Sequence, residues 1–485
     1  MSHQEASPEL NATTRAQGAA QLIAISDELA ELVSRFVRAG HEISLVGGSV
    51  RDTMIGRLTQ ASDLDLTTDA HPEQILELVD GWADSVWEVG IRFGTVAIRR
   101  GDRDLEITTY RAESYQPESR KPEVTFGSSL EGDLSRRDFT VNAMAVRLPS
   151  LEFVDRHGGM ADLEHGVLRT PITAAESFND DPLRMMRAAR FAAQLGMIVD
   201  ASVIDAMTQM AERIAIVSPE RVRDEFVKIL LSPRPRLGLE ILCNTGLADH
   251  VLPELPALRL EVDEHHRHKD VYEHSLIVLE QAIALEQSHV PTSEPDLVLR
   301  LSALLHDIGK PRTRKFESNG GVSFHHHEVV GARMVRKRLQ ALRFSNQIVD
   351  EVAMLTELHL RFHGYGAGAW TDSAVRRYVR DAQDQLTRLH KLTRADCTTR
   401  NQKRARSLQR SYDDLEQRIA ELSEAEELAA MRPDLDGNQI MEILGIGPGR
   451  EIGEAYRFLL ELRLDEGPLA PDEAAAQLRA WWAAR

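Results

Sequence analysis

The sequence contains little cysteine, no long apolar run and no excess of positive charge, and each absence excludes a class of protein. Two cysteines in 485 residues, Cys243 and Cys397, cannot form a disulfide framework or a cysteine-based zinc site. No segment approaches the run of ~20 apolar residues that a membrane-spanning helix needs. The polar residues 1–18 lack the basic and then apolar plan of a signal peptide. These absences favour a cytoplasmic protein with no membrane partner.

The formal net charge of −18 argues against a protein whose whole surface coats nucleic acid. The charge is nevertheless distributed unevenly. Arg376–Arg410 contains eleven basic and three acidic residues, whereas Asp413–Asp436 contains nine acidic and two basic ones. The basic stretch is a candidate track for RNA phosphates, and the alternative is a set of solvated helix faces. Six further cations are candidates to extend the track: Arg213, Arg221, Arg223, Lys228, Arg234 and Arg236.

Length predicts about three domains, at roughly 100–200 residues each. Changes in pattern divide the sequence into a flexible tail at 1–18, an α/β unit at 19–155, a helical region at 156–260, a histidine-rich region at 261–400 and a helical end at 401–485. Helical spacing of apolar residues predicts helices over Ala19–Ala39, Ser177–Leu195, Ala201–Ile216 and Pro219–Leu230. Short alternating segments predict strands at Ile43–Val46, Asp63–Thr67, Gly94–Ile98, Asp104–Tyr110, Val141–Arg147 and Leu151–Asp155.

A pair of glycines marks the first candidate site. Gly47 and Gly48 follow a short strand and precede an expected helix, so backbone N–H groups there can approach a phosphate closely. Arg51, one turn further on, adds a fixed positive charge. The alternative is an ordinary strand-to-helix turn.

Three carboxylates lie near this turn in the predicted sheet. Asp63 and Asp65 alternate on a strand, which places both on one face, and Glu106 on a later strand is a candidate third member. Carboxylates so close raise each other's pKa unless a cation lies between them, and Mg²⁺ suits such oxygen ligands. Three carboxylates beside a phosphate-binding turn fit two-metal phosphoryl transfer. For the aspartates alone, the alternative is a solvated strand edge.

Seven segments resemble one known family. Val46–Asp52, Ile55–Arg57 and Ser62–Leu66 are similar to the signature of the CCA-adding tRNA nucleotidyltransferase and bacterial poly(A) polymerase family, within the polymerase-β-like superfamily. Further matches follow in the family's order over roughly residues 40–235: Arg136–Ala145, Asp155–Leu163, Asp180–Phe191 and Ser218–Glu225. The resemblance implies an α+β fold, with an N-terminal nucleotidyltransferase head followed by a mostly helical neck, body and HD domain.

The same resemblance implies roles for several polar residues. Arg111, Arg136 and Arg137 are expected to contact the triphosphate or the primer, and Asp138 and Asn142 the ribose. The helix that selects the nucleotide is expected to contribute four residues: Asp181, Arg184, Arg187 and Arg190.

Base selection follows from the chemistry of two of these residues. Asp181 and Arg184 are three residues apart, so on one helix they share a face. A carboxylate only accepts hydrogen bonds and a guanidinium only donates them. Cytosine and adenine both offer an amino group beside a ring-nitrogen acceptor, whereas uracil and guanine present a carbonyl and an N–H there. The pair therefore predicts acceptance of CTP and ATP without a template. The alternative is a surface salt bridge, and Asp180 stands where many relatives have glutamate.

The histidine-rich region predicts a second site. His274, the adjacent His306 and Asp307, and Asp396 occur in the order of an HD phosphohydrolase metal site, which they resemble. Imidazole and carboxylate ligands suit Mn²⁺, Fe, Ni²⁺, Zn²⁺ or Mg²⁺. Two further histidines are candidates for a second metal: His327 and His359. One hypothesis is that this site hydrolyses a phosphate ester, and the alternative is that the domain is retained as a scaffold without activity.

We therefore expect an enzyme that adds CCA to the 3′ end of tRNA from CTP and ATP, with Mg²⁺ held by Asp63, Asp65 and Glu106 and a second divalent metal in the HD domain. Two alternatives within the class are poly(A) addition and addition of CC or A alone. An alternative from another class is an HD phosphohydrolase with a nucleotide-binding N-terminal unit. A non-catalytic RNA-binding scaffold is disfavoured by the intact carboxylates.

Overall fold

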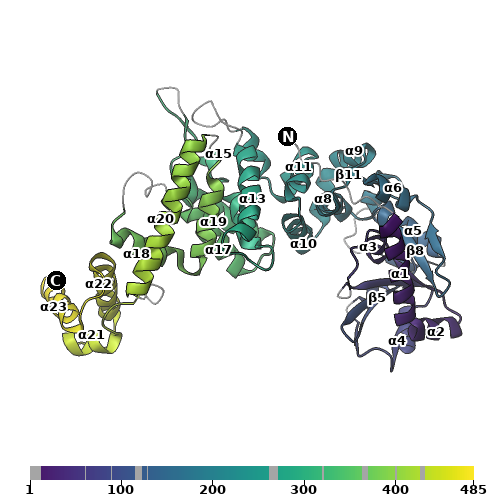
Figure 1. Cartoon of the computed structure of the whole chain (residues 1–485), viewed down its shortest axis with the longest axis horizontal. Helices are drawn as coiled ribbons and strands as arrows, with labels where there is room; N and C mark the ends of the chain where they lie inside the picture. Colours follow the sequence, from purple (N-terminus) through teal and green to yellow (C-terminus); the bar gives the residue numbers. More distant parts are fainter. Residues whose placement is uncertain are drawn as a thin grey trace. The chain divides into compact units, whose positions relative to one another are not determined.

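The computed structural model describes residues 12–59, 62–88, 90–114, 123–127, 129–260, 271–318, 322–362, 370–398, 401–426 and 432–485. The chain divides into two compact units, Met1–Pro253 and Glu254–Arg485 (Figure 1). Among these residues, no helix combines the length and the apolar character needed to cross a membrane.

A seven-stranded mixed sheet forms the centre of the first unit. Its strands lie in the order β3-β4-β5-β2-β1-β8-β9, and only β2 and β5 run parallel to each other. The strands are β1 Ile43–Val46, β2 Leu64–Thr68, β3 Ser85–Trp87, β4 Thr95–Arg100, β5 Arg103–Thr109, β8 Met144–Leu148 and β9 Phe153–Asp155. A separate antiparallel pair is formed by β6 Arg111–Ser114 and β7 Glu123–Phe126. Each of the six strands expected from the sequence has a counterpart, but those expected from Val141 and from Leu151 begin only at Met144 and Phe153. Strands β3, β6 and β7 were not foreseen, and the three residues of β3 are exposed.

The helices of this part of the chain are α1 Ala12–Glu28, α2 Ala30–Arg38, α3 Gly48–Met54, α4 Pro72–Val79 and α5 Leu130–Ser135, with the short 3₁₀ turns η1 Ile91–Phe93 and η2 Thr140–Asn142. Helix α1 packs on α2 and α3, and α2, α3 and α4 pack on the sheet. The expected tail at 1–18 is wrong from Ala12 onward, and its first eleven residues lie outside the described part of the chain. Helix α1 lies close to α3, since a Cβ atom at Gly18 would be 2.9 Å from the Thr53 carbonyl oxygen.

The rest of the first unit is helical: α6 Gly159–His165, α7 Ala174–Asp180, α8 Leu183–Leu195, α9 Ala201–Met210, η3 Ala211–Ile216, α10 Pro219–Leu230, α11 Pro235–Asn244 and α12 Leu247–Val251, with the paired β10 Val167–Leu168 and β11 Ile198–Val199. The expected single helix over Ser177–Leu195 is wrong. Asp181 is extended, with φ −143° and ψ 102°, because a residue before proline disfavours the helical conformation. Pro182 then begins α8, so the chain breaks at the residues expected to select the nucleotide.

The second unit is a helical bundle with a small C-terminal helical cluster. Its elements are η4 Pro256–Leu260, α13 Val271–Ser288, α14 Leu297–Leu305, α15 Lys310–Thr313, β12 Lys315–Phe316, β13 Val322–Ser323, α16 His327–Ala341, α17 Asn346–Leu358, α18 Asp372–Ala382, η6 Gln383–Gln385, α19 Leu386–Asp396, α20 Gln402–Glu426, α21 Gly437–Leu444, α22 Arg450–Glu466 and α23 Pro471–Ala483. Helices α21 to α23 share their own apolar core, which includes Ile440, Leu459 and Leu478.

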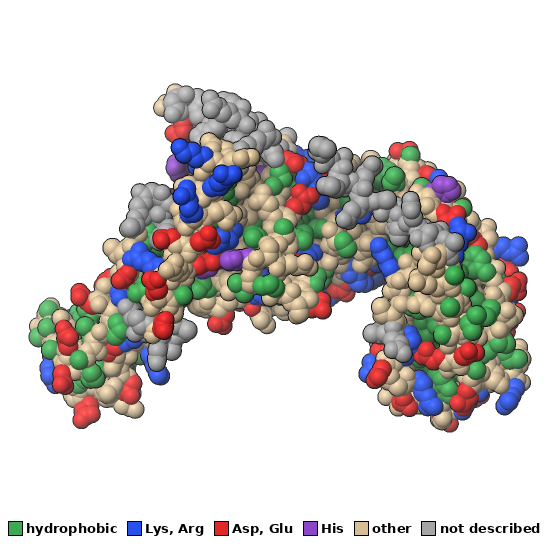
Figure 2. All heavy atoms as spheres, in the orientation of Figure 1, with side chains coloured by type: hydrophobic (Ala, Val, Ile, Leu, Met, Phe, Trp, Pro, Cys, Tyr) green, Lys and Arg blue, Asp and Glu red, His purple; other side chains and the backbone are tan. Residues whose placement is uncertain are grey.

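Most cations of the expected phosphate track contact the protein itself, which contradicts a continuous track. Those of α18 and α19 donate to carbonyls or carboxylates: Arg376 to Leu464, Arg377 to Asp465, Arg380 to Glu461, Arg388 to Asp296, Lys391 to Val290 and Arg394 to Asp413. Arg400 lies outside the described residues. Four cations near the start of α20 are exposed: Lys403, Arg404, Arg406 and Arg410. Figure 2 shows this basic end of α20 and the acidic side chains farther along it.

Candidate functional site

Two of the three expected carboxylates lie directly beside each other. Asp65 on β2 and Glu106 on β5 are register partners in the parallel pair, so their side chains share one face of the sheet. Asp63 immediately precedes β2 and is exposed. Ser49, which the sequence analysis overlooked, fixes this strand end, because its hydroxyl accepts from the Asp65 N–H at 2.9 Å and donates to the Asp63 carbonyl at 3.4 Å.

Two of these carboxylates, Asp65 and Glu106, are destabilised in their charged form. Burial raises the pKa of Asp65, Asp63 raises it further, and Arg137 opposes the shift. Burial also raises the pKa of Glu106, and the neighbouring Asp65 and Asp63 add to the shift. A divalent cation between these oxygens would relieve both the burial and the repulsion. The residues therefore fit a hard cation such as Mg²⁺.

The glycine turn lies against the same carboxylates. Gly47 has a φ of +67°, and a Cβ atom there would be 2.7 Å from Nη1 of Arg137. A Cβ atom at Gly48 would be 3.9 Å from Oδ2 of Asp65, an ordinary contact. The Gly47 N–H donates to the Met144 carbonyl at 3.3 Å, so in this state it is bonded within the sheet.

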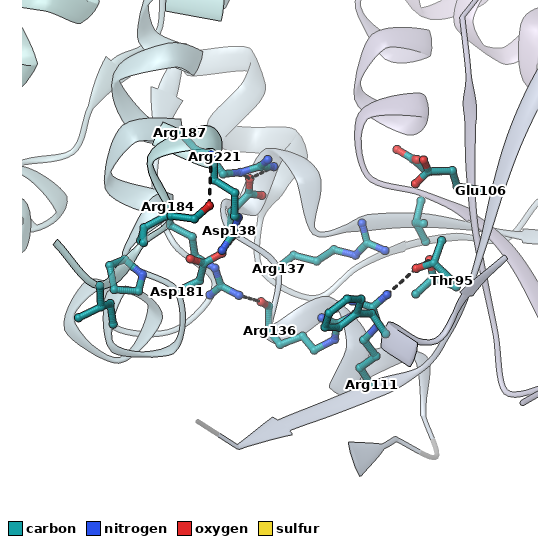
Figure 3. A pocket seen from close by; sticks show the side chains of 18 of the residues that line it. Thr95, Glu106, Arg111, Arg136, Arg137, Asp138, Asp181, Arg184, Arg187 and Arg221 are labelled. Atoms are coloured by element: carbon teal, nitrogen blue, oxygen red, sulfur yellow. Dashed lines mark hydrogen bonds and ion pairs between the residues drawn. The ribbon is translucent and has the colours of Figure 1, made fainter. Parts of the chain in front are cut away.

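A cavity of about 1080 Å³ opens over Asp65 and Glu106. Figure 3 shows Glu106 and Thr95 on the sheet side, Arg184, Arg187 and Arg221 on the opposite side, and the side chains of Arg111, Arg136 and Arg137 between them. The helical wall consists of residues from the α7–α8 region, the end of η3, the short connection after it and the start of α10: Asp181, Arg184, Arg187, Ala215, Ile216, Val217, Ser218, Pro219 and Arg221. The shape and polarity suit a phosphorylated ligand the size of a nucleotide.

Asp133, another residue that the sequence analysis missed, organises the arginines of this cavity. Its fully buried carboxylate pairs with Arg136 at 2.7 Å and with Arg137 at 3.2 Å. It also accepts from the Arg111 N–H at 3.4 Å and from the Thr67 hydroxyl at 3.5 Å. Burial alone would raise the pKa of Asp133, but Arg137 and Arg136 lower it below its usual range. The i, i+3 and i, i+4 spacing was visible in the sequence and was the available signal.

Replacing Asp133 with asparagine is expected to destabilise the first unit by about 3 kcal/mol, because it leaves two arginines beside a buried neutral group. Calorimetry of thermal unfolding measures the loss. Glu131→Gln on the same helix is the matched control and should change stability by no more than about 0.5 kcal/mol, since Glu131 is partly exposed and its ion pair with Arg147 is long, at 3.4 Å. Equal stability of the two variants would contradict the role of Asp133.

A second network lies beneath the cavity. Asp138 accepts from Asn142 at 2.9 Å and from Arg187 at 2.7 Å, and Asn142 in turn accepts from Arg51 at 2.5 Å. Burial alone would raise the pKa of Asp138, but Arg187 and Asn142 lower it well below its usual range. Asp138 and Arg187 line the cavity, whereas Arg51 and Asn142 support it from below.

Arg190 lies apart from the cavity lining. It pairs with Glu225 on α10 at 2.6 Å and stacks on the ring of Phe191. Arg190 therefore joins α8 to α10 in this structure, whereas the family resemblance implied that it contacts a nucleotide.

Asp181 and Arg184 both line the cavity, but they do not lie on one helix as expected, and they do not form the salt bridge that was the alternative. Asp181 accepts from Arg221 at 2.8 Å, and Arg184 donates to the hydroxyl of Ser177 at 2.9 Å. The reason is the break at Pro182, which places Asp181 outside helix α8.

The second unit brings the expected HD residues together in two adjoining groups. His274, His306 and Asp396 form one, and Asp307, His327 and His359 form the other, with the ligand atoms of each group within 4.8 Å of one another. Asp307 joins the groups: one oxygen lies 3.2 Å from Nε2 of His306, and the other lies 3.2 Å from Nε2 of His327. This arrangement fits two divalent cations that share one carboxylate.

The histidine tautomers also favour metal binding. Nδ1 of His306, His327 and His359 each lies 2.6–2.9 Å from a backbone carbonyl, which can only accept, so these Nδ1 atoms carry the protons. The Nε2 lone pairs therefore face the cluster. Nε2 of His327 and of His359 is buried without a hydrogen-bond partner. Burial and the neighbouring His306 lower the pKa of His359 to about 3, which keeps it neutral and able to bind a metal.

Comparison with protein families identifies all three regions. Their models match the poly(A) polymerase head domain at residues 43–169, a probable RNA- and SrmB-binding site of polymerase A at 196–258, and the HD domain at 271–401. Together with the carboxylates and the arginine-lined cavity, these matches define a nucleotidyltransferase that carries an HD domain and depends on divalent metal. An A-adding tRNA nucleotidyltransferase of Deinococcus radiodurans is 33% identical over 90% of this chain and 95% of the relative. The chain therefore belongs to the tRNA nucleotidyltransferase and poly(A) polymerase family, as its motifs predicted.

Two further comparisons give weaker support, one because it covers only part of the chain and the other because its sequence identity is low. A CCA-adding enzyme of Leuconostoc mesenteroides is 41% identical over 231 residues, which are 47% of this chain and only 55% of the relative. The crystal structure of the Bacillus stearothermophilus CCA-adding enzyme in complex with CTP is 23% identical, with a TM-score of 0.66 over 95% of this chain and 98% of the other. This likeness confirms the α+β fold.

Proposed function

We propose that this chain adds C, C and A in turn to the 3′ end of tRNA, using CTP, ATP and Mg²⁺ and releasing pyrophosphate. The observation that supports this most directly is the cavity that places Asp65 and Glu106 opposite a wall containing Asp181, Arg184 and Arg221. A tRNA substrate implies a cytoplasmic location.

In this proposal, the charged residues of the cavity bind the cations and the triphosphate, and the others position the ligand. Asp63, Asp65 and Glu106 hold the cations, and bound Mg²⁺ would activate the attacking hydroxyl and neutralise the leaving pyrophosphate. Arg111, Arg136 and Arg137 meet the triphosphate, because their positions between the two walls match a ligand that spans the cavity. The Gly47–Gly48 turn leaves room for the phosphates, and Asp138 and Arg187 face the sugar. The 3′-hydroxyl of the primer attacks the α-phosphate, and the bond to the pyrophosphate breaks.

The decisive experiment supplies a tRNA that lacks its last three nucleotides with labelled CTP and ATP, together and separately. Extension by CCA supports the proposal. A long adenosine tail would instead indicate a poly(A) polymerase, and no incorporation with any mixture would refute the proposal.

Addition of the final A alone is the second candidate within the class. It is favoured by the relative that matches nearly the full chain, which is an A-adding enzyme. A tRNA that already ends in CC separates the two: an A-adding enzyme extends only this primer, whereas a CCA-adding enzyme extends the shorter one as well.

We also propose a metal-dependent phosphohydrolase activity in the second unit, supported by the two orphaned imidazole nitrogens and the shared Asp307. Cations held there by His274, His306, Asp307, Asp396, His327 and His359 would supply an activated water. Lys310, whose Nζ lies 2.7 Å from Oδ2 of Asp307, holds that carboxylate in place.

A further inference from the structure

The end of helix α19 carries one of the HD residues and is followed by a contact to another. Asp396 is the last residue of α19, and its Oδ1 lies 2.9 Å from Nε2 of His274. The hydroxyl of Thr398, two residues later, lies 3.2 Å from Nδ1 of the same histidine. The last four carbonyls of a helix have no partner within it, so the position of this turn depends on what packs against it.

Helix α20 lies against α19 (Figure 1) and contacts this turn through a buried tyrosine. The hydroxyl of Tyr412 donates to the Thr393 carbonyl, one of the last four of α19, at 2.8 Å. Tyr412 is 5% exposed, and its ring stacks on Phe362 with centroids 4.0 Å apart. Leu415 and Ile419, one and two turns further along α20, are also buried. Tyr412 therefore supplies the partner that the end of α19 lacks.

Arg394, two residues before Asp396, is held by three residues of α20. Its Nε donates to Glu416 at 3.1 Å, its Nη1 to Gln409 at 3.0 Å and its Nη2 to Asp413 at 2.8 Å. These acceptors are four and three residues apart, so they lie on one face of α20. Arg394 is 6% exposed, and each of its side-chain nitrogens has an acceptor on α20. The carboxylates of α20 thus balance a buried charge beside the end of α19.

Glu416 also joins α20 to the helix that carries His274. Its Oε1 lies 3.2 Å from Nε2 of His289, which directly follows α13, and 3.3 Å from Nδ1 of His390 on α19. One carboxylate of α20 therefore contacts both α19 and the end of α13, the two helices whose side chains meet at Asp396 and His274.

We propose that α20 is a brace for the HD metal site, in which Tyr412 and Arg394 are positioning residues that fix the turn bearing Asp396. This inference rests on the proposed metal site of the phosphohydrolase and names the part of the chain that controls its affinity for metal. Neither residue belongs to the two ligand groups, so each acts through the backbone of α19. Loss of the Tyr412 hydroxyl leaves the Thr393 carbonyl buried and unpaired, which favours displacement of the turn.

The first test removes this hydroxyl with Tyr412→Phe and measures binding of Ni²⁺ by calorimetric titration of the full chain. Ni²⁺ is the probe because imidazole ligands suit it, whereas sites made of carboxylates alone suit Mg²⁺ or Mn²⁺. The affinity is expected to fall roughly 10-fold, as on loss of an outer partner of a ligand. Tyr378→Phe is the matched control. The Tyr378 hydroxyl is buried without a hydrogen-bond partner among the described residues, so its removal should leave the affinity unchanged.

The second test separates positioning from general stability. Arg394→Met should lower the affinity for Ni²⁺ by about 10-fold or more. Arg388→Met, near the other end of α19, also breaks two ion pairs, with Asp296 at 2.7 Å and with Glu351 at 3.2 Å, but should retain the affinity. Thermal unfolding of both proteins shows how far their stabilities differ. The visible absorption of bound Ni²⁺, which reports the arrangement of its ligands, should change in Arg394→Met and Tyr412→Phe but not in Arg388→Met.

Wild-type affinity for Ni²⁺ in Tyr412→Phe would overturn the brace, and this variant decides the matter if Arg394→Met does not fold. An equal loss of affinity in Arg394→Met and Arg388→Met would overturn it too, since the effect would then follow stability alone. A wild-type chain that binds Ni²⁺ but hydrolyses no phosphate ester would refute the proposed hydrolase and leave the brace intact. A wild-type chain that binds no Ni²⁺ would overturn both proposals.

Discussion

Replacing Asp65 with asparagine is expected to lower incorporation of CTP into tRNA by about 10³-fold or more, because a ligand of the activating cation is worth several kcal/mol. Asparagine has nearly the same shape, so the sheet and the contact between Ser49 and the Asp65 N–H should persist. Rates of single-nucleotide addition at saturating Mg²⁺ measure the effect. Binding of tRNA, measured by filter retention, should remain unchanged.

The matched control for this prediction is Asp104→Asn. Asp104 lies on β5, two residues before Glu106, but it is partly exposed, does not line the cavity and pairs with Arg99 on β4. Its replacement should leave the rate within about twofold, since exposed ion pairs contribute little. If Asp65→Asn and Asp104→Asn behave alike, the carboxylates of the cavity do not hold the catalytic cation.

Replacing Asp307 with asparagine is expected to reduce hydrolysis of a simple phosphodiester such as bis-p-nitrophenyl phosphate by at least about 100-fold, because losing even an outer partner of a ligand costs 10- to 100-fold. Both groups of ligands lose the carboxylate that joins them. The metal content of protein incubated with Mn²⁺ or Ni²⁺, measured by mass spectrometry, should fall as well.

The control His326→Ala changes an adjacent but exposed histidine and should retain both metal and hydrolysis. Extension of tRNA by Asp307→Asn should be unaffected, since the cavity lies wholly in the other compact unit. Metal retained at the wild-type level in Asp307→Asn would contradict the shared-ligand arrangement. Loss of tRNA extension would show that the two units are coupled.

Local patterns in the sequence predicted much of the first site. The alternation of Asp63 and Asp65 located the strand that carries Asp65 into the cavity, and the order of the motifs identified the family and its fold. The pairing of Asp65 with Glu106 could not be derived in this way, because it depends on the parallel register of strands that lie about forty residues apart. The sequence offered Glu106 as one acidic residue on a strand, and only the sheet places it beside Asp65.

The helical wall of the cavity was predicted less well, and the reason is local. Spacing of three residues indicated a shared helix face for Asp181 and Arg184, but Pro182 between them ends one helix and begins the next. The partner of Asp181 is Arg221, forty residues away, in a segment that matched a family motif but for whose arginine the sequence suggested only contact with RNA. In the second unit the order of ligands was predicted, whereas the position of Asp307 between two groups required the folded bundle.

Position 47 has no conservative replacement, which has a genetic consequence. The backbone at Gly47 has a positive φ, which residues with a Cβ atom adopt only with strain. A Cβ atom at this position would also come too close to the guanidinium of Arg137, so that side chain would have to move. Alanine, usually the mildest substitution, would therefore act much as a larger residue would. Any missense change in this codon is expected to displace Arg137 from the carboxylates, so variation in a population should be absent here while it is tolerated at the exposed glycines of the surface turns.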